Sequence, residues 1–454
     1  MVFASVNPAT GEAIEQYPAH SPDELDARLD RAVAGFAANR ERPIAERARR
    51  LERAADLLED RADQYGALMT REMGKPVRQA EAEAEKCAWV CRYYAEHGAD
   101  FLTDEPVETE AQTSYVAYEP LGPVLAVMPW NFPFWQLFRF GAPALMAGNT
   151  VLLKHAPNVP GCALAIEALL RDAGFTDDEL QVLLVEEEAV GDVLADRRVR
   201  AATLTGSVGA GRAVARQAAA QLKPTVLELG GSDPFIVCAD ADLQAAASVG
   251  CTARMQNNGQ SCIAAKRFIV EAPVADDFTE RLIEEVEALR VGDPQDPHTD
   301  IGPLARTDLR DGVHDQVERA VGAGALAATG GHTLDREGFY YAPTVLTNVE
   351  PATVAFEEEI FGPVASVVVA DDADHALTLA NDTRFGLGGS IFTEDRDKGE
   401  RMARGLEAGC AFVNEMTKSD PRLPFGGIKD SGYGRELCRH GIHEFVNAKT
   451  VWVE

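Results

Sequence analysis

Two residues with chemical potential, Glu228 and Cys262, lie in the stretch 226–266. Glu228 ends an apolar run that predicts a buried strand, and Cys262 closes the polar sequence Asn-Asn-Gly-Gln-Ser-Cys. A thiol that attacks a carbonyl carbon and a carboxylate that later activates water are the two groups that thioester chemistry requires. The alternative is an inert cysteine that packs as a small hydrophobe. The glycine and polar neighbours of Cys262 favour a reactive thiol.

The other seven cysteines sit among apolar or helical neighbours, where a packing role is the better interpretation: Cys87, Cys91, Cys162, Cys238, Cys251, Cys410 and Cys438. They follow neither a disulfide framework nor a C-x-x-C pattern, and no zinc site is spelled out. We therefore expect a reducing cytoplasm and no metal. The first sixteen residues lack the basic and apolar regions of a signal peptide.

Further candidates stand at the ends of expected strands. The sequence Thr-Gly-Ser-Val-Gly-Ala-Gly at 205–211 brings Gly206, Ser207 and Gly211 to the start of a helix, where backbone amides could approach a pyrophosphate. A plain strand-to-helix turn explains the pattern about as well. Lys154 could reach a ribose or phosphate, or it could simply be solvated. Asn131, in Pro-Trp-Asn-Phe-Pro, could bind a developing oxyanion with its amide or could be a structural turn residue.

The remaining pattern predicts an α/β protein with two doubly wound, Rossmann-like domains. We expect strands in the first domain at Val124–Met128, Thr150–Lys154, Gln181–Val185, Ala201–Thr205 and Thr225–Leu229, and helices at Gly161–Ala173 and Gly211–Ala220. We expect strands in the second at Phe235–Cys238, Phe268–Glu271, Val364–Ala370, Gly388–Phe392 and Cys410–Asn414, and helices at Asp276–Leu289 and Asp374–Ala380. The domains meet at 228–232, and a cleft at such a junction is the default ligand site.

The flanking segments have simpler patterns. Helical periodicity runs from Ser21, a good N-cap, to about Gly98, and Thr113–Glu119 alternates like a strand. The apolar stretch Leu121–Gly148 contains Asn131, Gln136, Arg139 and prolines, so we expect no membrane span.

The charge balance is unusual, because 73 acidic residues face 43 basic ones, of which nine are lysines, for a net charge of −30. Such a surface repels nucleic acid and anionic membranes. It is similar to the surfaces of proteins from organisms that keep molar salt in the cytosol, where screening removes the self-repulsion. An ordinary acidic protein is the alternative to this halophilic interpretation.

The motifs, taken together and in order, resemble the NAD(P)-dependent aldehyde dehydrogenase family over essentially the whole chain. The matching stretches are PWNFP at 129–133, the lysine at 154, TGSVGAG at 205–211, ELGG at 228–231, GQSC at 259–262, EEIFGPV at 358–364 and PFGGIKDSGYGRE at 424–436. The resemblance implies a cofactor-binding domain at 1–229, interrupted by an oligomerisation hairpin at about 101–121, a catalytic domain at 230–435, and a C-terminal oligomerisation segment at 436–454. It also implies a homodimer or homotetramer, joined through the hairpin and the last strand, Ala448–Val453.

The resemblance also implies roles for single residues. Cys262 would be the nucleophile, Asn131 and the Cys262 amide the oxyanion hole, and Glu228 the general base, with Glu436 assisting proton relay. The residues expected at the cofactor, NADP or NAD, are Trp130, Lys154, Gly206, Ser207, Gly211, Glu359 and Phe361. Those expected at the aldehyde are Arg139, Trp135 and Phe425.

Within the family, KHAPNV at 154–159 and ELGGSDPFIV at 228–237 resemble the succinate-semialdehyde dehydrogenases. Pro157 stands where many NAD-preferring members carry a glutamate, so nothing there repels a 2′-phosphate. Gln256 stands where other members of this branch carry an arginine, so Arg139 is expected to hold the substrate carboxylate, with Arg254 or Arg422 as possible helpers. Ala264 replaces the second cysteine of redox-sensing members. An arginine in the apolar run around Arg139 must otherwise pair with a protein carboxylate.

Three alternatives stay open at this stage. The substrate could be another aliphatic or aromatic aldehyde. A thiol hydrolase or acyltransferase would need a histidine partner, and none lies within thirty residues of Cys262. A non-catalytic relative would be expected to lose the nucleophile, which this chain keeps.

Overall fold

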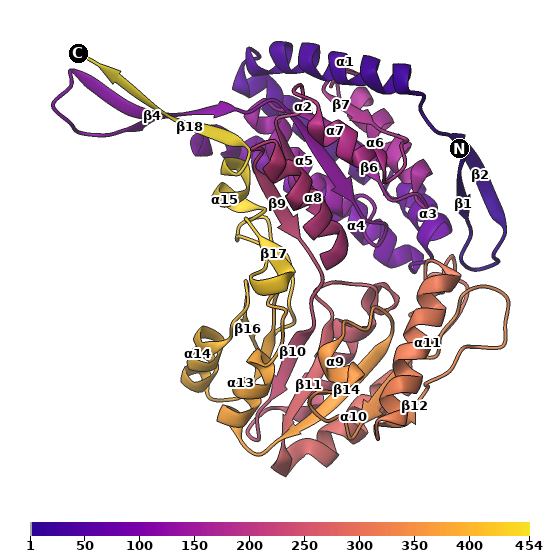
Figure 1. The fold of residues 1–454 in the computed structure, drawn as a ribbon. Coiled ribbons are helices and arrows are strands. Elements are labelled where there is room, and N and C mark those ends of the chain that lie inside the picture. The colour runs from indigo at the N-terminus through magenta and orange to yellow at the C-terminus, as the bar shows by residue number, and fades with distance from the viewer. Residues whose placement is uncertain (1) are drawn as a thin grey trace.

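The computed structural model describes residues 2–454 and consists of two α/β lobes and a projecting arm (Figure 1). The upper lobe holds α1 (Pro22–Arg40), α2 (Ile44–Asp60), α3 (Ala62–Met73), α4 (Val77–Phe101), α5 (Trp135–Ala147), α6 (Pro160–Asp172), α7 (Ala189–Ala195), α8 (Val208–Ala220) and α15 (Cys438–His443). Its sheet contains β5 (Pro123–Met128), β6 (Thr150–His155), β7 (Leu180–Val182), β8 (Ala201–Thr205), β9 (Thr225–Glu228) and β17 (Gly432–Tyr433).

The upper sheet has the order β17-β9-β8-β5-β6-β7 and is parallel except for β17. Every residue of β6 and β8 is buried, as expected of strands that helices cover on both faces. The chain begins this sheet at β5, adds β6 and β7 on one side, and then returns to add β8 and β9 on the other. The order therefore reverses between β5 and β8, where open α/β sheets bind their ligands at the carboxyl ends of the strands.

The lower lobe contains a second sheet of the order β12-β13-β14-β11-β10-β15-β16, in which only β12 is antiparallel to its neighbour. Its strands are β10 (Asp233–Val237), β11 (Ala265–Glu271), β12 (Leu326–Thr329), β13 (Thr344–Thr347), β14 (Val364–Ala370), β15 (Ser390–Phe392) and β16 (Phe412–Val413). Its helices are α9 (Leu243–Met255), α10 (Ala275–Glu287), α11 (Thr307–Gly322), α12 (Val354–Glu357), α13 (Ala373–Asn381) and α14 (Arg396–Gly405). Three short 3₁₀ turns complete the chain at Gln256–Gly259, Ala272–Val274 and Lys429–Ser431.

The expected doubly wound architecture is confirmed, and so is the start of α1. Ser21 and Glu24 form a reciprocal capping box, with Glu24 N donating to Ser21 Oγ at 3.3 Å and Ser21 N donating to Glu24 Oε2 at 2.7 Å. The sequence did not reveal the N-terminal hairpin of β1 (Val2–Val6) and β2 (Ala13–Pro18). None of the helices within residues 2–454 is long and apolar enough to cross a membrane.

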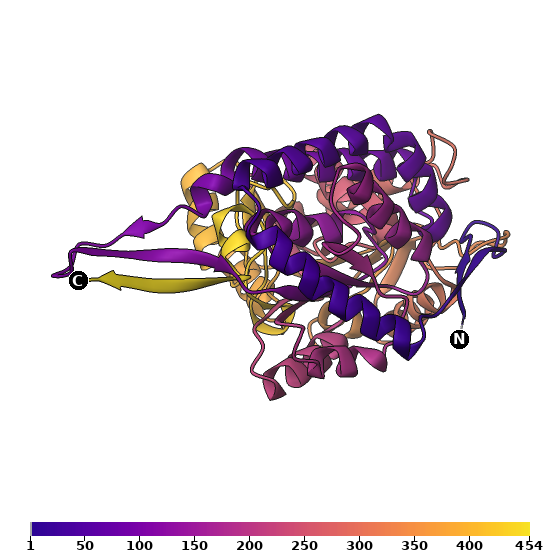
Figure 2. The ribbon, with the colours of Figure 1, turned by 90° about the horizontal axis from the view of Figure 1, so that it is seen from above.

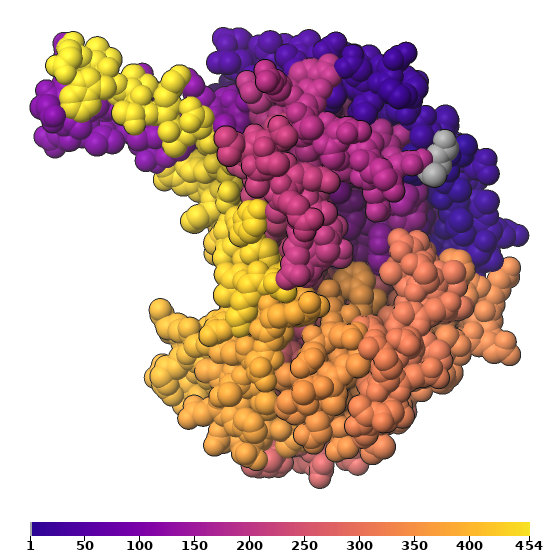
Figure 3. Space-filling view, in the orientation of Figure 1, coloured from indigo at the N-terminus to yellow at the C-terminus, as the bar shows by residue number. Residues whose placement is uncertain are grey.

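The arm is a three-stranded sheet of β18 (Val446–Val453), β4 (Thr113–Pro120) and β3 (Glu105–Pro106), which extends away from both lobes (Figures 1 and 2). The C-terminal segment, yellow in Figure 3, runs along one side of the molecule from the lower lobe to the arm. On its way it returns to the upper lobe at β17, where Gly432 pairs with Glu228. The chain therefore re-enters the upper lobe at residues 432–433, just before residue 435, where the sequence placed the end of the second domain.

We expect the excess of acidic residues to make stability depend on salt. Lowering KCl from about 1 M to about 0.1 M lengthens the Debye distance from about 3 Å to about 10 Å, so that more distant carboxylates repel one another. With a net charge of −30, the melting temperature should fall over this range. Thermal unfolding followed by circular dichroism measures it.

Sucrose is the control for this measurement, because an excluded osmolyte stabilises proteins without screening charge. Adding sucrose at about 0.1 M KCl should therefore raise the melting temperature without producing the change in electrophoretic mobility that salt causes by screening charge. A melting temperature that does not change between the two salt concentrations would contradict the halophilic interpretation.

Candidate active site

The two residues singled out first, Glu228 and Cys262, lie at the connection between the lobes. Glu228 is the last residue of β9, and the chain then crosses through Gly230-Gly231 into β10. A Cβ on Gly231 would lie 2.8 Å from the carbonyl oxygen of Cys262, and one on Gly230 would lie 2.2 Å from Glu359 Oε2. Only glycine allows this crossing to approach both groups so closely.

The loop that carries Cys262 is held in an unusual backbone conformation. Asn257 and Asn258 have φ values of 55° and 58°, in the left-handed region. Asn258 fixes this turn by donating from Nδ2 to the carbonyl oxygens of Gly74 at 2.9 Å and Pro303 at 2.8 Å. Since such backbone strain persists only where the surroundings impose it, the turn holds the half-buried Cys262 in one place.

Asn131 is joined to the same loop. Its Nδ2 donates to the carbonyl oxygen of Gln260 at 3.0 Å, and Asn257 Nδ2 donates back to the carbonyl oxygen of Asn131 at 2.9 Å. An asparagine amide has two N–H groups, so one remains after the bond to Gln260. The structure therefore brings the predicted oxyanion donor to the loop of the predicted nucleophile.

Glu228 is buried without strong stabilisation of its charge. Neither carboxylate oxygen accepts a hydrogen bond of ordinary geometry from the described residues. Gly426, at φ 152°, leaves room for Oε1 of Glu228, because a Cβ on Gly426 would lie 2.7 Å from this oxygen. Burial raises the pKa of Glu228 to about 8, with Arg139 opposing this shift and Glu436 adding to it. A carboxyl group with such a pKa can exchange protons near neutral pH.

Burial also raises the pKa of the Cys262 thiol, to about 12, while the cations of Arg139 and Lys266 oppose the shift. Lys266 is itself fully buried, and its Nζ donates to the carbonyl oxygens of Ser261 at 2.9 Å and Cys262 at 2.7 Å. It also lies 3.4 Å from Glu359 Oε1. The thiol is therefore protonated as the structure stands, and its reaction needs a proton acceptor.

Arg139 has a protein partner. It forms a buried ion pair with Glu436, its Nη2 donates to Thr205 Oγ1 at 3.3 Å, and its guanidinium lies 4.7 Å from the centre of the Phe425 ring. Of the two possibilities that the sequence left open, pairing with a protein carboxylate is the one observed. Burial raises the pKa of Glu436, and the charge of Arg139 opposes that rise.

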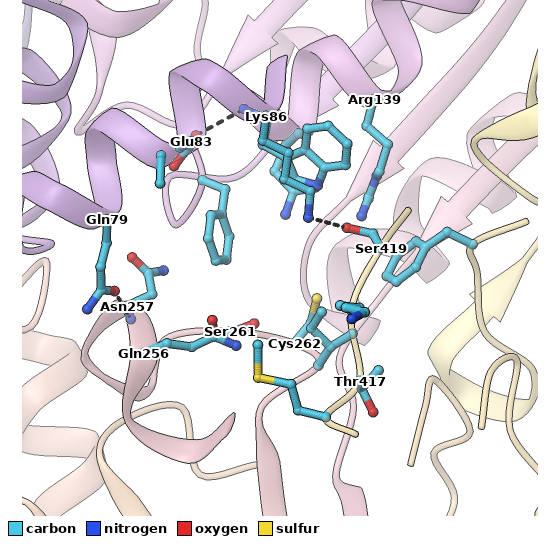
Figure 4. A pocket seen from close by; sticks show the side chains of 18 of the residues that line it. Gln79, Glu83, Lys86, Arg139, Gln256, Asn257, Ser261, Cys262, Thr417 and Ser419 are labelled. Carbon is cyan, nitrogen blue, oxygen red and sulfur yellow. Dashed lines mark hydrogen bonds between the residues drawn. The ribbon is translucent and has the colours of Figure 1, made fainter. Parts of the chain in front are cut away.

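A cavity of about 360 Å³ opens beside Cys262, and the three residues predicted at the aldehyde, Trp135, Arg139 and Phe425, line it (Figure 4). Its wall also contains residues that the sequence did not reveal, among them Gln79, Lys86, Met416, Thr417 and Ser419. These come from α4 and from the loop after β16, far apart in the chain, so only the tertiary structure unites them. Asn131, Glu228 and Glu436 do not belong to its wall.

The two suggested helpers of Arg139 are not part of this wall. Arg254 is fully buried and donates to backbone oxygens, including those of Val364 at 2.6 Å and Ile360 at 2.8 Å. Arg422 is exposed and pairs with Asp420 at 2.6 Å. Arg254 therefore holds loops together, and neither residue is placed to bind a ligand in the cavity.

The predicted cofactor residues gather at the carboxyl edge of the upper sheet. Trp130 follows β5, Lys154 is the last residue but one of β6, and Gly206 and Ser207 follow β8, on both sides of the point where the strand order reverses. Ser207 caps α8 by accepting from Ala210 N at 3.2 Å. The first amides of a helix lack intrahelical partners. A Cβ on Gly209 would come no closer than 3.9 Å to another residue's side chain, so the N-terminus of α8 is open to an anion.

Three other residues predicted at the cofactor complete this picture. Gly211 lies against Leu229, where a Cβ would come within 2.5 Å of the leucine side chain. Phe361 packs edge-on against Trp130, with ring centres 5.8 Å apart, and Glu359 accepts from Gly231 N at 3.1 Å. The residues present therefore fit a dinucleotide that reaches from α8 towards Cys262. Among the described residues no cluster of potential metal ligands occurs.

The fold and the site define a two-lobed α/β protein with a strand-order reversal at the carboxyl edge of one sheet and a half-buried cysteine, Cys262, at the junction of the lobes. The sequence model of the aldehyde dehydrogenase family matches residues 1–451, so the chain belongs to the aldehyde dehydrogenase family.

Individual relatives cover the full length of this chain. The probable succinate-semialdehyde dehydrogenase [NADP(+)] of Synechocystis is 55% identical over 453 residues, covering 100% of both chains. Succinate-semialdehyde dehydrogenase [NADP(+)] 1 of Mycobacterium tuberculosis is 54% identical over 456 residues, again covering 100% of both. The crystal structure of succinic semialdehyde dehydrogenase from Streptococcus pyogenes in complex with NADP+ superimposes with a TM-score of 0.97, at 36% identity and 99% coverage of both chains.

Proposed function

We propose that this protein oxidises succinate semialdehyde to succinate with NADP+. The observation that carries the proposal is the full-length similarity, at 54–55% identity, to proteins named as succinate-semialdehyde dehydrogenases [NADP(+)]. The cavity beside Cys262 supports it, because cationic side chains from α4 and α5 line it at Lys86 and Arg139. Oxidation of another aldehyde is the alternative.

In this proposal the chain provides a nucleophile, an oxyanion site and a base. The Cys262 thiol gives its proton to water in the cavity, and the resulting thiolate attacks the aldehyde carbon. The free N–H of the Asn131 side chain, with the Cys262 amide, stabilises the alkoxide. Bound NAD(P)+ supplies the hydride acceptor. The acyl group remains on Cys262 as a thioester, which water then hydrolyses after losing a proton to Glu228.

Glu436 would act through Arg139. Their ion pair lies beside Glu228, and the two charges shift the pKa of Glu228 in opposite directions. We propose that the pair sets the proton affinity of the base and relays protons from it.

The cofactor would be held between Lys154, the start of α8, and Glu359 with Phe361. Pro157 brings no carboxylate to this region, which favours NADP+. Burial lowers the pKa of Lys154, whereas the charges of Glu187 and Glu188 oppose that shift. Because these two acids would weaken binding of a 2′-phosphate, NAD+ should be tested alongside NADP+.

The test is the absorbance of the reduced cofactor, measured with NADP+ and with NAD+ against succinate semialdehyde, butanal and benzaldehyde in molar KCl. We expect the highest kcat/KM with succinate semialdehyde and NADP+. A higher kcat/KM with butanal or benzaldehyde would reject the proposed substrate, and a higher value with NAD+ would reject the proposed cofactor.

The arm supports a proposal about assembly. We propose that residues 101–121 and 436–454 join copies of the chain into a homodimer or homotetramer, with 1–229 binding the cofactor and 230–435 carrying the catalytic cysteine. Val107, Trp452 and Val453 are exposed on the projecting sheet, and exposed apolar edge strands tend to pair with other chains. Multi-angle light scattering in molar KCl should give the mass of two or four chains. A mass near 48.9 kDa would mean a monomer.

We propose a cytoplasmic location on the basis of the cysteines. All eight are free thiols in the structure, which suits a reducing compartment.

Replacing Arg139 should lower the stability of the protein and change its pH–rate profile with every aldehyde. Arg139→Leu leaves Glu436 as a buried carboxyl without its partner, which is strongly destabilising in proteins, by about 3–5 kcal/mol. It also removes the cation that lowers the pKa of Glu228, so that pKa should rise further above its present value of about 8. We expect lower thermal stability and an alkaline shift of the pH–rate profile with succinate semialdehyde and with butanal.

The double variant Arg139→Leu/Glu436→Gln is the matched control, because it removes both charges. Its melting temperature and pH profile should return towards those of the unchanged protein. If Arg139→Leu instead lowers kcat/KM for succinate semialdehyde alone, Arg139 binds the substrate carboxylate directly, as the sequence had suggested.

A further inference from the structure

The turn between α3 and α4 holds the loop of Cys262. The carbonyl oxygen of Gly74 accepts from Asn258 Nδ2 at 2.9 Å, and Gln79 Oε1 accepts from the backbone N–H of Asn257 at 2.6 Å (Figure 4). Gly74 caps α3 in the left-handed region, at φ 82°, which a glycine adopts without strain. The two asparagines that shape the loop of Cys262 are therefore both fixed by this turn.

The same turn holds the segment of Asn131 through a buried ion pair. Lys75 is fully buried and pairs with Glu83 on α4. The other carboxylate oxygen of Glu83, Oε1, accepts from the backbone N–H groups of Phe134 at 2.8 Å and Trp135 at 2.9 Å, where α5 begins. A carboxylate at the start of a helix satisfies N–H groups that have no partner within the helix. Glu83 thus fixes the backbone just after Asn131.

The residues between Asn131 and α5 have contacts of their own. Lys75 Nζ lies 4.1 Å from the centre of the Phe132 ring, and His155 Nε2 lies 2.8 Å from the carbonyl oxygen of Pro133. A cation over an aromatic face is attracted by the ring. The segment that carries Asn131 is therefore held at every residue up to the start of α5.

Neither stability nor ligand binding explains the ion pair of Lys75 and Glu83. A buried ion pair is often no more stable than a well-packed apolar pair of similar volume, because both charges lose their water. Glu83 lines the cavity beside Cys262, but each of its carboxylate oxygens already has a protein partner. What the pair does provide is a carboxylate oxygen in a fixed place beside two backbone N–H groups.

The direction of the Asn131 amide depends on where its backbone lies. One N–H of Asn131 Nδ2 is used in the bond to the carbonyl oxygen of Gln260. The other must reach the oxygen of the attacked aldehyde, and such a donor is effective only at about 2.7–3.1 Å. A displacement of about 1 Å can slow a reaction by about 10²-fold. The anchor that Glu83 gives to the start of α5 therefore bears directly on the oxyanion site.

We propose that Glu83, held in place by Lys75, is a positioning residue for the oxyanion site: it fixes the start of α5 and so aims the Asn131 amide at the substrate oxygen. The proposal rests on the proposed function, because it concerns the attack of Cys262 on an aldehyde. Glu83 does not touch the reacting atoms and acts through Asn131. Since the same turn also fixes the loop of Cys262, both donors of the oxyanion site are set by one part of the scaffold.

The test compares two double variants that both lack the ion pair, because removing Glu83 alone would leave Lys75 as a buried cation without a partner. Lys75→Met/Glu83→Gln keeps an oxygen that can accept from Phe134 and Trp135. Lys75→Met/Glu83→Met keeps the length of the side chain without an acceptor. Two reactions of Cys262 are measured: the burst of reduced cofactor with the aldehyde that the unchanged protein oxidises best, in which an alkoxide forms, and alkylation by iodoacetamide, in which none forms.

We expect the burst to slow by about 10²-fold in Lys75→Met/Glu83→Met and much less in Lys75→Met/Glu83→Gln. Alkylation should proceed at the same rate in both double variants and in the unchanged protein, which also shows that the variants fold. Glu83→Asp keeps the charge beside Lys75 but shortens the side chain. It should likewise slow the burst and not the alkylation, and it decides the matter if Lys75→Met/Glu83→Met does not fold.

A cycle with Asn131→Ala tests whether Glu83 acts through Asn131. In Asn131→Ala, adding Lys75→Met/Glu83→Met should slow the burst by a much smaller factor than in the unchanged protein, because both changes remove the same interaction. A general distortion of the site would slow the burst by the same factor with and without the Asn131 side chain.

The outcomes keep this inference apart from the proposed function. If the unchanged protein gives no burst with succinate semialdehyde, butanal or benzaldehyde although iodoacetamide alkylates Cys262, the proposed function is wrong and the inference falls with it. If butanal or benzaldehyde is oxidised best, the proposed substrate is wrong, whereas the expected pattern of slowing still supports the inference. If both double variants slow the burst equally, if alkylation slows by the same factor, or if the slowing is the same in Asn131→Ala, the inference is wrong and the proposed function stands.

Discussion

Cys262→Ala should abolish aldehyde oxidation, with neither a burst nor a steady-state production of reduced cofactor. Cys262 is the half-buried cysteine on the loop that Asn131 and Lys266 hold in place, and it opens onto the cavity. No other nucleophile is needed by the proposed chemistry, so its removal should leave only background reaction. Rapid-mixing absorbance, followed by mass spectrometry of the acyl–enzyme, measures both consequences.

Cys410→Ala is the matched control, because Cys410 is the other half-buried cysteine in the structure and lies outside the cavity wall. Its thiol contacts the carbonyl oxygen of Leu387 at 3.5 Å. This variant should keep the burst and the acyl adduct. A burst that survives in Cys262→Ala and disappears in Cys410→Ala would move the nucleophile to Cys410.

The sheets could be predicted because their strands are buried on both faces. A run such as Val124–Met128 is apolar throughout, and this is the pattern of a strand covered by helices. Boundaries were less certain: the strand expected at Gln181–Val185 is formed at Leu180–Val182, and the helix expected from Gly211 begins at Val208. In the second case Ser207, which caps the helix, marks its start better than the glycines do.

The hairpin at the N-terminus escaped prediction for the opposite reason. In β1 and β2 most residues are exposed or half-buried, so no continuous apolar pattern marks them as strands. Their pairing depends on contacts with other parts of the fold, which a local pattern does not encode.

The proposed catalytic groups are indicated by local sequence motifs, whereas the wall of the cavity is not. Arg139 and Glu436 are distant in the chain, and only the return of the C-terminal segment to β9 brings them together. Lys86 sits within an ordinary helical pattern, in which a lysine is usually a solvated side chain. Its place on the cavity wall emerges only when α4 and the loop of Ser419 face the same cavity.

The position of Cys262 shows the same limit. The sequence Asn-Asn-Gly-Gln-Ser-Cys suggests a turn, but not that two asparagines adopt left-handed backbone conformations. Asparagine tolerates this region better than most residues, and the contacts from Asn258 to the two carbonyl oxygens supply the remaining constraint. Those partners lie in other segments, so the conformation is a tertiary effect.

Glu228→Gln should separate acylation from hydrolysis. The glutamine keeps the shape of the side chain but cannot accept a proton, so the thioester on Cys262 should form and then persist. We expect one burst of reduced cofactor per active site, followed by a steady-state rate lower by a factor of about 10²–10⁴. Quenched samples should contain the acyl–enzyme. An unchanged steady-state rate would remove Glu228 from the mechanism.

The raised pKa of Glu228 adds a prediction about pH. The base is the deprotonated carboxylate, so hydrolysis by the unchanged protein should speed up as pH rises through about 8, and Glu228→Gln should lose this rise in rate.

The same pKa predicts a change in stability. Because the folded-state pKa of Glu228 lies above the unfolded value of about 4.3, the stability contributed by the protonated carboxyl is complete below about pH 4.3 and is lost as pH rises through about 8. The glutamine variant has no such proton to lose. The difference in melting temperature between the variant and the unchanged protein should therefore shift in favour of the variant between pH 6 and pH 9, and a constant difference would mean that Glu228 is already ionised at the lower pH.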